Sequence, residues 1–183
     1  MAQPKSFFEI ELKALLSEEK YKKLTDELPK KMKKINEEII FTTRYRPGDI
    51  RLRHSDKTIE IVCKEGDPTK ISRKEIVLPL PTKEYLEHFA QALEMLDFTF
   101  DPPWEKHKQE FMHKHKGYEY VVCVQHIKNF AYILEVEFLS ENDDAHIHEP
   151  NLREIIESLG CEPINPEDFS KKIKAYIKKN NKK

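Results

Sequence analysis

The chain begins with a stretch in which charged and apolar residues alternate. Glu9, Glu11 and Lys13 occupy every second position, with Ile10 and Leu12 between them. Successive side chains of a β-strand point to opposite faces, so this pattern predicts a strand with one charged and one apolar face. The two glutamates would lie about 6.6–6.8 Å apart, close enough to hold a divalent cation between them. A surface strand with its charges in solvent has the same pattern, so the other strands decide between the two readings.

Similar patterns continue along the chain. Runs that suit strands cover residues 34–46, 49–53, 58–64, 73–80, 106–114, 118–127 and 130–139. Apolar positions at helical spacing predict helices over residues 18–28, 82–95, 150–159 and 166–179. Ser17 is a suitable N-cap for the first helix, and Pro29 is expected to end it.

About eight strands with helices between and after them, and no strict alternation of strand and helix, indicate an antiparallel α+β fold. With 183 residues the chain is long enough for one domain with a sizeable core. We expect a single domain over residues 1–183. Its strands and inserted helices would span about 6–140, and its C-terminal helices about 150–179.

Most of the predicted strands carry a charged face opposite an apolar one. The charged positions are Lys13, Arg51, Arg53, Lys64, Arg73, Lys106 and Lys108, together with Glu9, Glu11, Glu60, Glu75, Glu135 and Glu137. Helices can cover the apolar faces, and the charged faces would then meet inside a closed eight-stranded antiparallel barrel. Burying opposed charges without a ligand is costly. An anionic ligand with divalent metal would satisfy both signs, because Mg²⁺ binds carboxylates and phosphates and arginine suits phosphate oxygens.

This ordered set of charged strands resembles the CYTH superfamily, the triphosphate tunnel metalloenzymes, over roughly residues 6–178. That superfamily includes class IV adenylyl cyclases, thiamine triphosphatases and inorganic tripolyphosphatases. The resemblance implies an eight-stranded antiparallel tunnel with helices packed outside. In such a tunnel basic residues bind a triphosphate, and acidic residues bind Mg²⁺ or Mn²⁺.

The resemblance also implies roles for individual residues. The substrate-binding set would be Lys13, Arg51, Arg53, Lys64, Arg73, Glu75, Lys106 and Lys108. Glu135 and Glu137 would hold a metal that bridges the phosphates. Glu9 and Glu11 would serve a second metal and the attacking water, and with Lys13 they form the expected catalytic group.

The expected activity is metal-dependent hydrolysis of inorganic tripolyphosphate or of an organic triphosphate such as thiamine triphosphate. Two alternatives stay open: a class IV adenylyl cyclase that makes cyclic AMP from ATP, and a non-catalytic module that binds polyphosphate or a nucleotide. The sequence departs from the family pattern at Glu65-Gly66, Val77, Lys108 and 127–130. These departures leave the organic part of the substrate unassigned.

The composition limits the kinds of partner and the compartment that we expect for this protein. There are 32 basic and 33 acidic residues, so no overall field favours nucleic acid or a membrane surface. No apolar run approaches the ~20 residues of a membrane span, and no signal-peptide pattern opens the chain. Cys63, Cys123 and Cys161 are widely spaced, which indicates reduced thiols in a cytoplasmic protein. The expected partner is a small triphosphate-containing molecule, and a homodimer is possible.

Histidine and tryptophan add weaker signals. His113 and His115, like His146 and His148, have a spacing that could place two imidazoles on one strand face, but no cysteine or carboxylate completes a metal-binding pattern. We expect these to be surface histidines. Trp104 could stack on an organic ring, and packing at the mouth of the tunnel or in the core is the simpler expectation.

Overall fold

The computed structural model describes residues 3–181. Its strands are β1 (Lys5–Leu16), β2 (Lys33–Arg46), β3 (Ile50–His54), β4 (Ile59–Lys64), β5 (Ser72–Pro79), β6 (Thr99–Phe100), β7 (Trp104–His115), β8 (Tyr118–Ile127) and β9 (Ala131–Ser140). Its helices are α1 (Glu18–Lys31), α2 (Lys83–Met95), α3 (Ala145–Ser158) and α4 (Pro166–Asn180).

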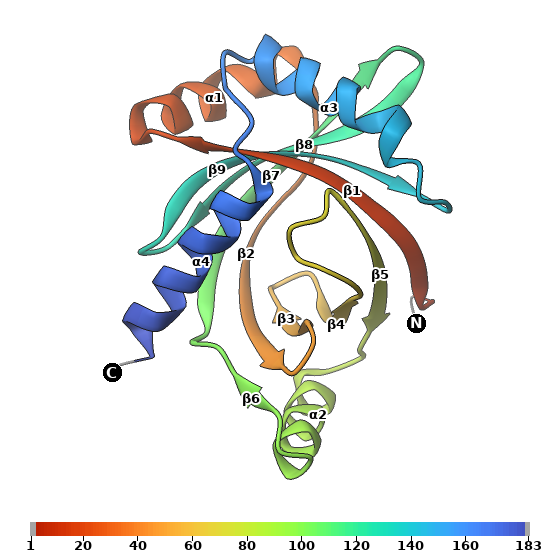
Figure 1. The fold of residues 1–183 in the computed structure, drawn as a ribbon, viewed down its shortest axis with the longest axis vertical. Coiled ribbons are helices and arrows are strands. Elements are labelled where there is room, and N and C mark those ends of the chain that lie inside the picture. Colours follow the sequence, from red (N-terminus) through yellow and green to blue (C-terminus); the bar gives the residue numbers. More distant parts are fainter. Residues whose placement is uncertain (1–2, 182–183) are drawn as a thin grey trace.

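Eight of these strands form one closed antiparallel barrel (Figure 1). The neighbours run β3, β4, β5, β1, β9, β8, β7 and β2, and β2 pairs again with β3 to close the ring. The short β6 pairs only with the end of β2, through Tyr45 and Arg46. The predicted fold, an eight-stranded antiparallel barrel with added helices, is therefore confirmed. The two-residue β6 was not predicted, because so short a strand leaves no periodic pattern.

The apolar outer face of β1, β8 and β9 is covered by α1 and α3. Leu12, Val122 and Val136 from the strands share one buried core with Leu28 of α1 and Ile156 of α3. All five side chains are 2% exposed or less. Burying one such aliphatic side chain contributes about 1.5–3 kcal/mol. The opposite face of these strands, which is charged in β1 and β9 and uncharged in β8, points into the barrel.

A second, smaller core lies at the other end of the molecule, where α2 projects (Figure 1). Leu86 and Leu93 of α2 pack against Leu52 of β3 and Ile61 of β4. The spacing of seven residues between the two leucines places them on one face of the helix, as the apolar pattern predicts. The helix thus covers the outside of β3 and β4.

Two helix boundaries differ from the prediction, and each of these two helices runs through a proline. α1 continues past Pro29 to Lys31, and the amide of Met32 still donates to the carbonyl of Leu28 at 2.8 Å. A proline this close to the C-terminus removes a single helical hydrogen bond. α3 starts at Ala145, before Pro150, because the amides of the first turn bond to the carbonyl of Asp144.

The expectation of surface histidines is wrong for His148. Its side chain is 3% exposed, Nδ1 lies 3.0 Å from the hydroxyl of Tyr120, and the ring stacks on Phe138 at 3.7 Å between centroids. The early start of α3 brings it into the core. His115 is different, since its Nε2 lies 2.8 Å from a carboxylate oxygen of Glu154 near the surface.

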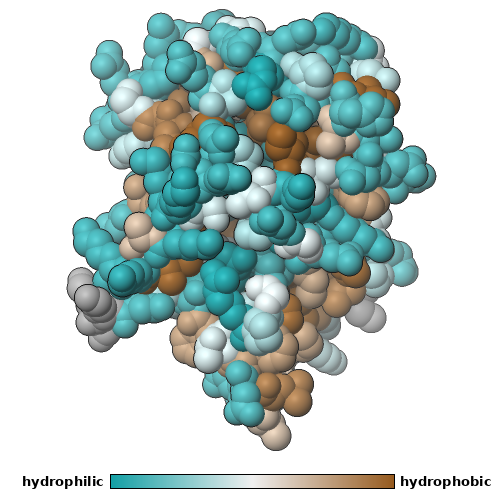
Figure 2. Space-filling model, viewed as in Figure 1, coloured by the Kyte–Doolittle hydropathy of each residue, from teal (hydrophilic) through white to brown (hydrophobic). Residues whose placement is uncertain are grey.

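The face shown in Figure 2 is mostly hydrophilic, with several apolar patches, one of which lies at the tip over α2. There Met95 is 85% and Leu96 69% exposed. Among residues 3–181, no helix has the length and apolar character needed to cross a bilayer.

Candidate functional site

A cavity of about 200 Å³ lies inside the barrel. All eight barrel strands contribute side chains to its wall, and α4 and the two loops that hold Pro68 and Phe130 supply the rest. The strands place these side chains by alternation. Glu9, Glu11 and Lys13 point inward from β1, while Ile10 and Leu12 belong to the outer core. The cavity is therefore built from the charged faces that the sequence predicts.

The wall of this cavity is strongly basic. Ten basic and only three acidic side chains line it. The basic ones are Lys13, Arg44, Arg46, Arg51, Arg53, Lys64, Arg73, Lys106, Lys108 and Lys174, and the acidic ones are Glu9, Glu11 and Glu135. So many cations inside one enclosed space repel one another unless an anion binds among them. The arrangement suits a ligand of high negative charge density.

Buried carboxylates behind the wall hold several of these cations in place. Asp49, at the turn between β2 and β3, is 6% exposed and has three arginine partners. Arg51 donates to it through two nitrogens at 2.8 and 2.9 Å, and Arg73 donates at 3.0 Å. Nε of Arg44 lies 2.8 Å from the same carboxylate. Burial alone would raise the pKa of Asp49, but the guanidinium groups, Arg51 above all, hold it well below its usual range.

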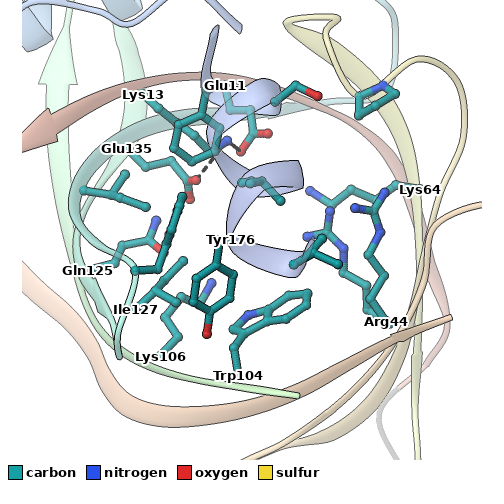
Figure 3. Close-up of a pocket in the computed structure, with 18 of the residues that line it drawn as sticks. Glu11, Lys13, Arg44, Lys64, Trp104, Lys106, Gln125, Ile127, Glu135 and Tyr176 are labelled. Atoms are coloured by element: carbon teal, nitrogen blue, oxygen red, sulfur yellow. Dashed lines mark ion pairs between the residues drawn. The ribbon is translucent and has the colours of Figure 1, made fainter. Parts of the chain in front are cut away.

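Lysine and glutamate pairs organise the β1 side of the cavity. Lys13 lies between Glu11 and Glu135, with N···O distances of 2.5 and 3.1 Å (Figure 3). Lys64 forms ion pairs with Glu9 and, at 2.8 Å, with Glu75. In this arrangement each carboxylate of β1 already has an ammonium partner.

Lys106 differs from the other cations that the barrel strands place in the cavity wall. Within residues 3–181 it makes no ion pair, although it lies among Lys108, Arg53 and Glu135. Burial, together with the charges of Lys108 and Arg53, lowers its pKa to about 8. A bound anion would favour the protonated form of this lysine and raise that pKa again.

Three uncharged side chains also contribute to the wall of the cavity. Gln125 of β8 is 2% exposed, and its Nε2 has no hydrogen-bond partner in the part of the chain that the structure describes. It faces the cavity across from Lys64 and Arg44 (Figure 3). Trp104 and Tyr176 form a further part of the wall (Figure 3). Trp104 thus lies in the wall of the cavity, where its ring is available to a ligand.

Helix α4 forms one side of the cavity. Phe169 and Tyr176 of α4 contact Phe130, which follows β8, at centroid distances of 6.2 and 5.1 Å. The ammonium of Lys13 lies 5.7 Å from the centre of the Phe169 ring. The amide of Ile164, just before the helix, donates to the carbonyl of Lys13 at 2.7 Å. The C-terminal segment is therefore attached to the same strand that carries the predicted catalytic group.

Most of the predicted site residues come together in this cavity. Those that line it are Glu9, Glu11, Lys13, Arg51, Arg53, Lys64, Arg73, Lys106, Lys108 and Glu135. Glu75 and Glu137 do not line it. Glu75 is buried behind Lys64, and Glu137 lies near Glu110 and Cys123.

Sequence reasoning missed several members of the site. Arg44 and Arg46 continue the alternation of β2, and Asp49 precedes Arg51 by two residues, so spacing alone could have included them. Gln125 is a polar residue in the apolar run of β8, which is also a visible signal. The contribution of α4 had no such signal, because it depends on where the helix packs.

Three of the four glutamates that were predicted to bind metal face the cavity, and each is paired with a lysine. Glu9, Glu11 and Glu135 lie on the neighbouring strands β1 and β9 and face the cavity. Carboxylate oxygens are the ligands that Mg²⁺ and Mn²⁺ prefer. The pKa values of the two glutamates on β9 shift in opposite directions. Lys13 and Lys108 hold the pKa of Glu135 well below its usual range, whereas burial and Glu135 raise the pKa of Glu137 to about 8.

No protein-family model and no curated protein matches the sequence. Solved structures do match. A protein of Pyrococcus horikoshii OT3 superposes with a TM-score of 0.67 at 19% identity, over 85% of this chain and 92% of that one. A candidate adenylate cyclase from Bacillus halodurans gives 0.59 at 16% identity, over 87% and 93%. A candidate adenylyl cyclase from Hippeastrum, described as having a dominant triphosphatase activity, gives 0.56 at 11% identity, over 87% and 90%.

These likenesses extend over nearly the whole of each chain. They show that the protein shares the fold of these structures, which here is the closed eight-stranded antiparallel barrel that the order of charged strands predicts. A shared fold does not by itself define a reaction. The activity therefore has to be argued from the cavity.

Proposed function

We propose that this protein hydrolyses a triphosphate inside the tunnel, either inorganic tripolyphosphate or the triphosphate group of an organic ester. The observation that carries this proposal is the cavity wall, which has ten basic and three acidic side chains drawn from seven of the eight barrel strands and from α4. A chain of phosphates offers enough negative charge to balance such a wall. Arginine forks bind phosphate oxygens through two parallel hydrogen bonds.

The basic side chains would hold the substrate and stabilise charge in the transition state. Arg51 and Arg73 are fixed by Asp49, so their guanidinium groups are oriented before the substrate arrives. Such pre-oriented groups stabilise developing charge without reorganising. Lys106, which lacks an ion-pair partner within residues 3–181, is ready to pair with a phosphate oxygen. Together these residues provide positioning and charge neutralisation, which dominate catalysis of phosphoryl transfer.

The carboxylates of β1 would orient the nucleophile. The oxygen of a water molecule forms a bond to the terminal phosphorus, and the bond from that phosphorus to the bridging oxygen breaks. The products are phosphate and a diphosphate, and the proton of the water passes to the Glu9–Glu11 pair. A divalent ion held by these glutamates would position the attacking water, and one held by Glu135 would neutralise charge on the phosphoryl oxygens.

The comparisons support this proposal without fixing the substrate. One structural neighbour is described by a dominant triphosphatase activity, and another as a candidate adenylate cyclase. Trp104, Ile127 and Tyr176 give the cavity an apolar wall. An organic group attached to the phosphates would lie against these side chains.

The experiment is a panel of tripolyphosphate, thiamine triphosphate and ATP with Mg²⁺ or Mn²⁺, in which released phosphate and cyclic AMP are both measured. We expect phosphate from at least one substrate and none in excess EDTA. Cyclic AMP from ATP as the main product would replace hydrolysis with cyclisation. Binding of all three compounds without any product would reduce the protein to a binding module.

A further inference from the structure

A second cluster of metal-binding side chains lies inside the barrel, beside the cavity but not in its wall. It consists of Glu110 from β7, Cys123 from β8 and Glu137 from β9. One ligand atom from each of these residues lies within 4.8 Å of the other two. Glu110 and Cys123 are also direct partners across the two strands. Three adjacent strands therefore bring one thiol and two carboxylates to the same point.

The carboxylate of Glu137 has too few partners for its burial. The residue is 8% exposed and accepts no hydrogen bond from residues 3–181. Nζ of Lys108 lies 4.0 Å from it, and the same atom lies 2.6 Å from Glu110. Lys108 therefore pairs with Glu110, and the carboxylate of Glu137 has no close hydrogen-bond donor among residues 3–181. A buried carboxylate in this condition is unfavourable unless a cation or proton binds it.

The thiol of Cys123 is equally enclosed. Its residue is 0% exposed, and Sγ lies 4.0 Å from a carboxylate oxygen of Glu110. A thiolate next to two carboxylates is a donor set that Zn²⁺ and similar ions bind well, whereas Mg²⁺ prefers oxygen ligands alone. The donor set therefore differs in kind from Glu9, Glu11 and Glu135.

We propose that Glu110, Cys123 and Glu137 form a binding site for a thiophilic divalent cation such as Zn²⁺, separate from the carboxylates that face the cavity. Binding would release the proton of the thiol to the solvent, together with the proton of Glu137 where that carboxyl is protonated, so that the sulfur and both carboxylates carry three negative charges. The ion and Lys108 carry three positive charges, and the buried group becomes neutral. This proposal does not rest on the hydrolysis of a triphosphate.

Cobalt is a suitable probe because a bond between Co²⁺ and a thiolate gives a charge-transfer absorption band in the near ultraviolet. The metal-free full-length protein would be titrated with Co²⁺, in the absence of any phosphate compound. We expect a charge-transfer band that saturates at one Co²⁺ per chain, persists in excess Mg²⁺ and disappears when Zn²⁺ is added.

Substitutions test whether the charge-transfer band comes from Co²⁺ bound at Glu110, Cys123 and Glu137. Cys123→Ser and Cys123→Ala should both lose the band, while Cys63→Ser and Cys161→Ser should keep it. Glu110→Gln should weaken Co²⁺ binding at least about tenfold, since removing even an outer partner of a ligand costs about 10–100-fold in metal affinity. Thermal unfolding of each variant checks that it is folded, and Glu110→Gln tests the site even if neither Cys123 variant folds.

Several results would overturn the proposal. They are the absence of a thiolate band in the parent protein, its survival in a folded Cys123 variant, its removal by Mg²⁺, and unchanged Co²⁺ affinity in Glu110→Gln. None of these results bears on whether the cavity hydrolyses a triphosphate, so the two proposals can fail independently.

Discussion

The role of Asp49 gives the sharpest prediction about how the cavity is built. Its buried carboxylate neutralises part of the charge of Arg44, Arg51 and Arg73. Asp49→Asn keeps the size of the side chain but removes its charge, and its amide group would point a donor at guanidinium groups. Three arginines would then lie close together around a neutral residue.

The magnitude follows from the burial of these partners. Removing one member of a buried ion pair costs about 3–5 kcal/mol because the remaining charge is uncompensated. The side chain of Arg73 is 6% exposed, but those of Arg44 and Arg51 are 11% and 21% exposed, so water can partly solvate them. We therefore expect the free energy of unfolding to fall by about 3 kcal/mol, the lower end of that range.

The pH dependence has a definite sign. The pKa of Asp49 is lowered in the folded protein, so its stabilising effect is present above the usual pKa of an aspartate. That effect is lost as the pH falls towards the lowered value. The difference in stability between the parent and Asp49→Asn should accordingly be largest near neutral pH and shrink in acid.

Urea denaturation at neutral pH measures the effect. With a slope of about 1–3 kcal/mol per molar urea, the loss corresponds to a midpoint lower by about 1 M or more. Asp26→Asn, at an exposed position on α1, is the control and should leave the midpoint unchanged. Tripolyphosphate should stabilise Asp49→Asn more than it stabilises the parent, because the freed guanidinium groups can bind it. The reasoning is refuted if Asp49→Asn has the same midpoint as Asp26→Asn.

Three further predictions test the basic wall of the cavity, the role of Lys106 and the core beneath α3. Arg53→Ala should lower kcat/KM for tripolyphosphate at least tenfold, or about 1.4 kcal/mol, while Lys31→Ala at the exposed end of α1 should have no effect; equal effects would contradict the assignment. Because the pKa of Lys106 is about 8 and lysine is a cation only below its pKa, calorimetry should show weaker tripolyphosphate binding as the pH rises from about 7 to 9. Lys106→Met should remove most of that change, and an unaltered pH profile would exclude Lys106 as its source. In α3, Ile156→Ala should destabilise the protein by about 2–5 kcal/mol in thermal unfolding, and Ile147→Ala, whose side chain is 43% exposed, by less than about 0.5; similar losses would place the core elsewhere.

The sequence is most informative about this fold where alternation is strong. The charged and apolar faces of β1, β3 and β9 are clear in the sequence, and the barrel closes around the charged ones. It is less informative where a local rule competes with tertiary packing. Pro29 suggests the end of a helix, but it is tolerated inside α1, as Pro150 is inside α3, because the core holds both helices in place.

The site shows the same division. The alternation of β1, taken together with the charged faces of the other strands, predicts that Glu9, Glu11 and Lys13 face the interior, and the structure places them in the cavity wall. It does not reveal that Glu137 and Glu135, two residues apart on β9, have different neighbours. That difference arises because Lys13 reaches Glu135, whereas Glu137 lies near Glu110 and Cys123. The neighbours of the two glutamates depend on contacts between strands that are distant in sequence, and a single sequence does not show which strands lie side by side.

The most direct test of the central claim is the rate of tripolyphosphate hydrolysis by Glu11→Gln under conditions in which calorimetry shows that this variant binds tripolyphosphate with Mg²⁺. Gln keeps the size of the side chain and one acceptor, so the fold and the basic wall stay intact. The account predicts binding close to that of the parent and loss of turnover, because Glu11 orients the attacking water rather than the phosphates. Turnover at the parental rate by the bound variant would contradict it.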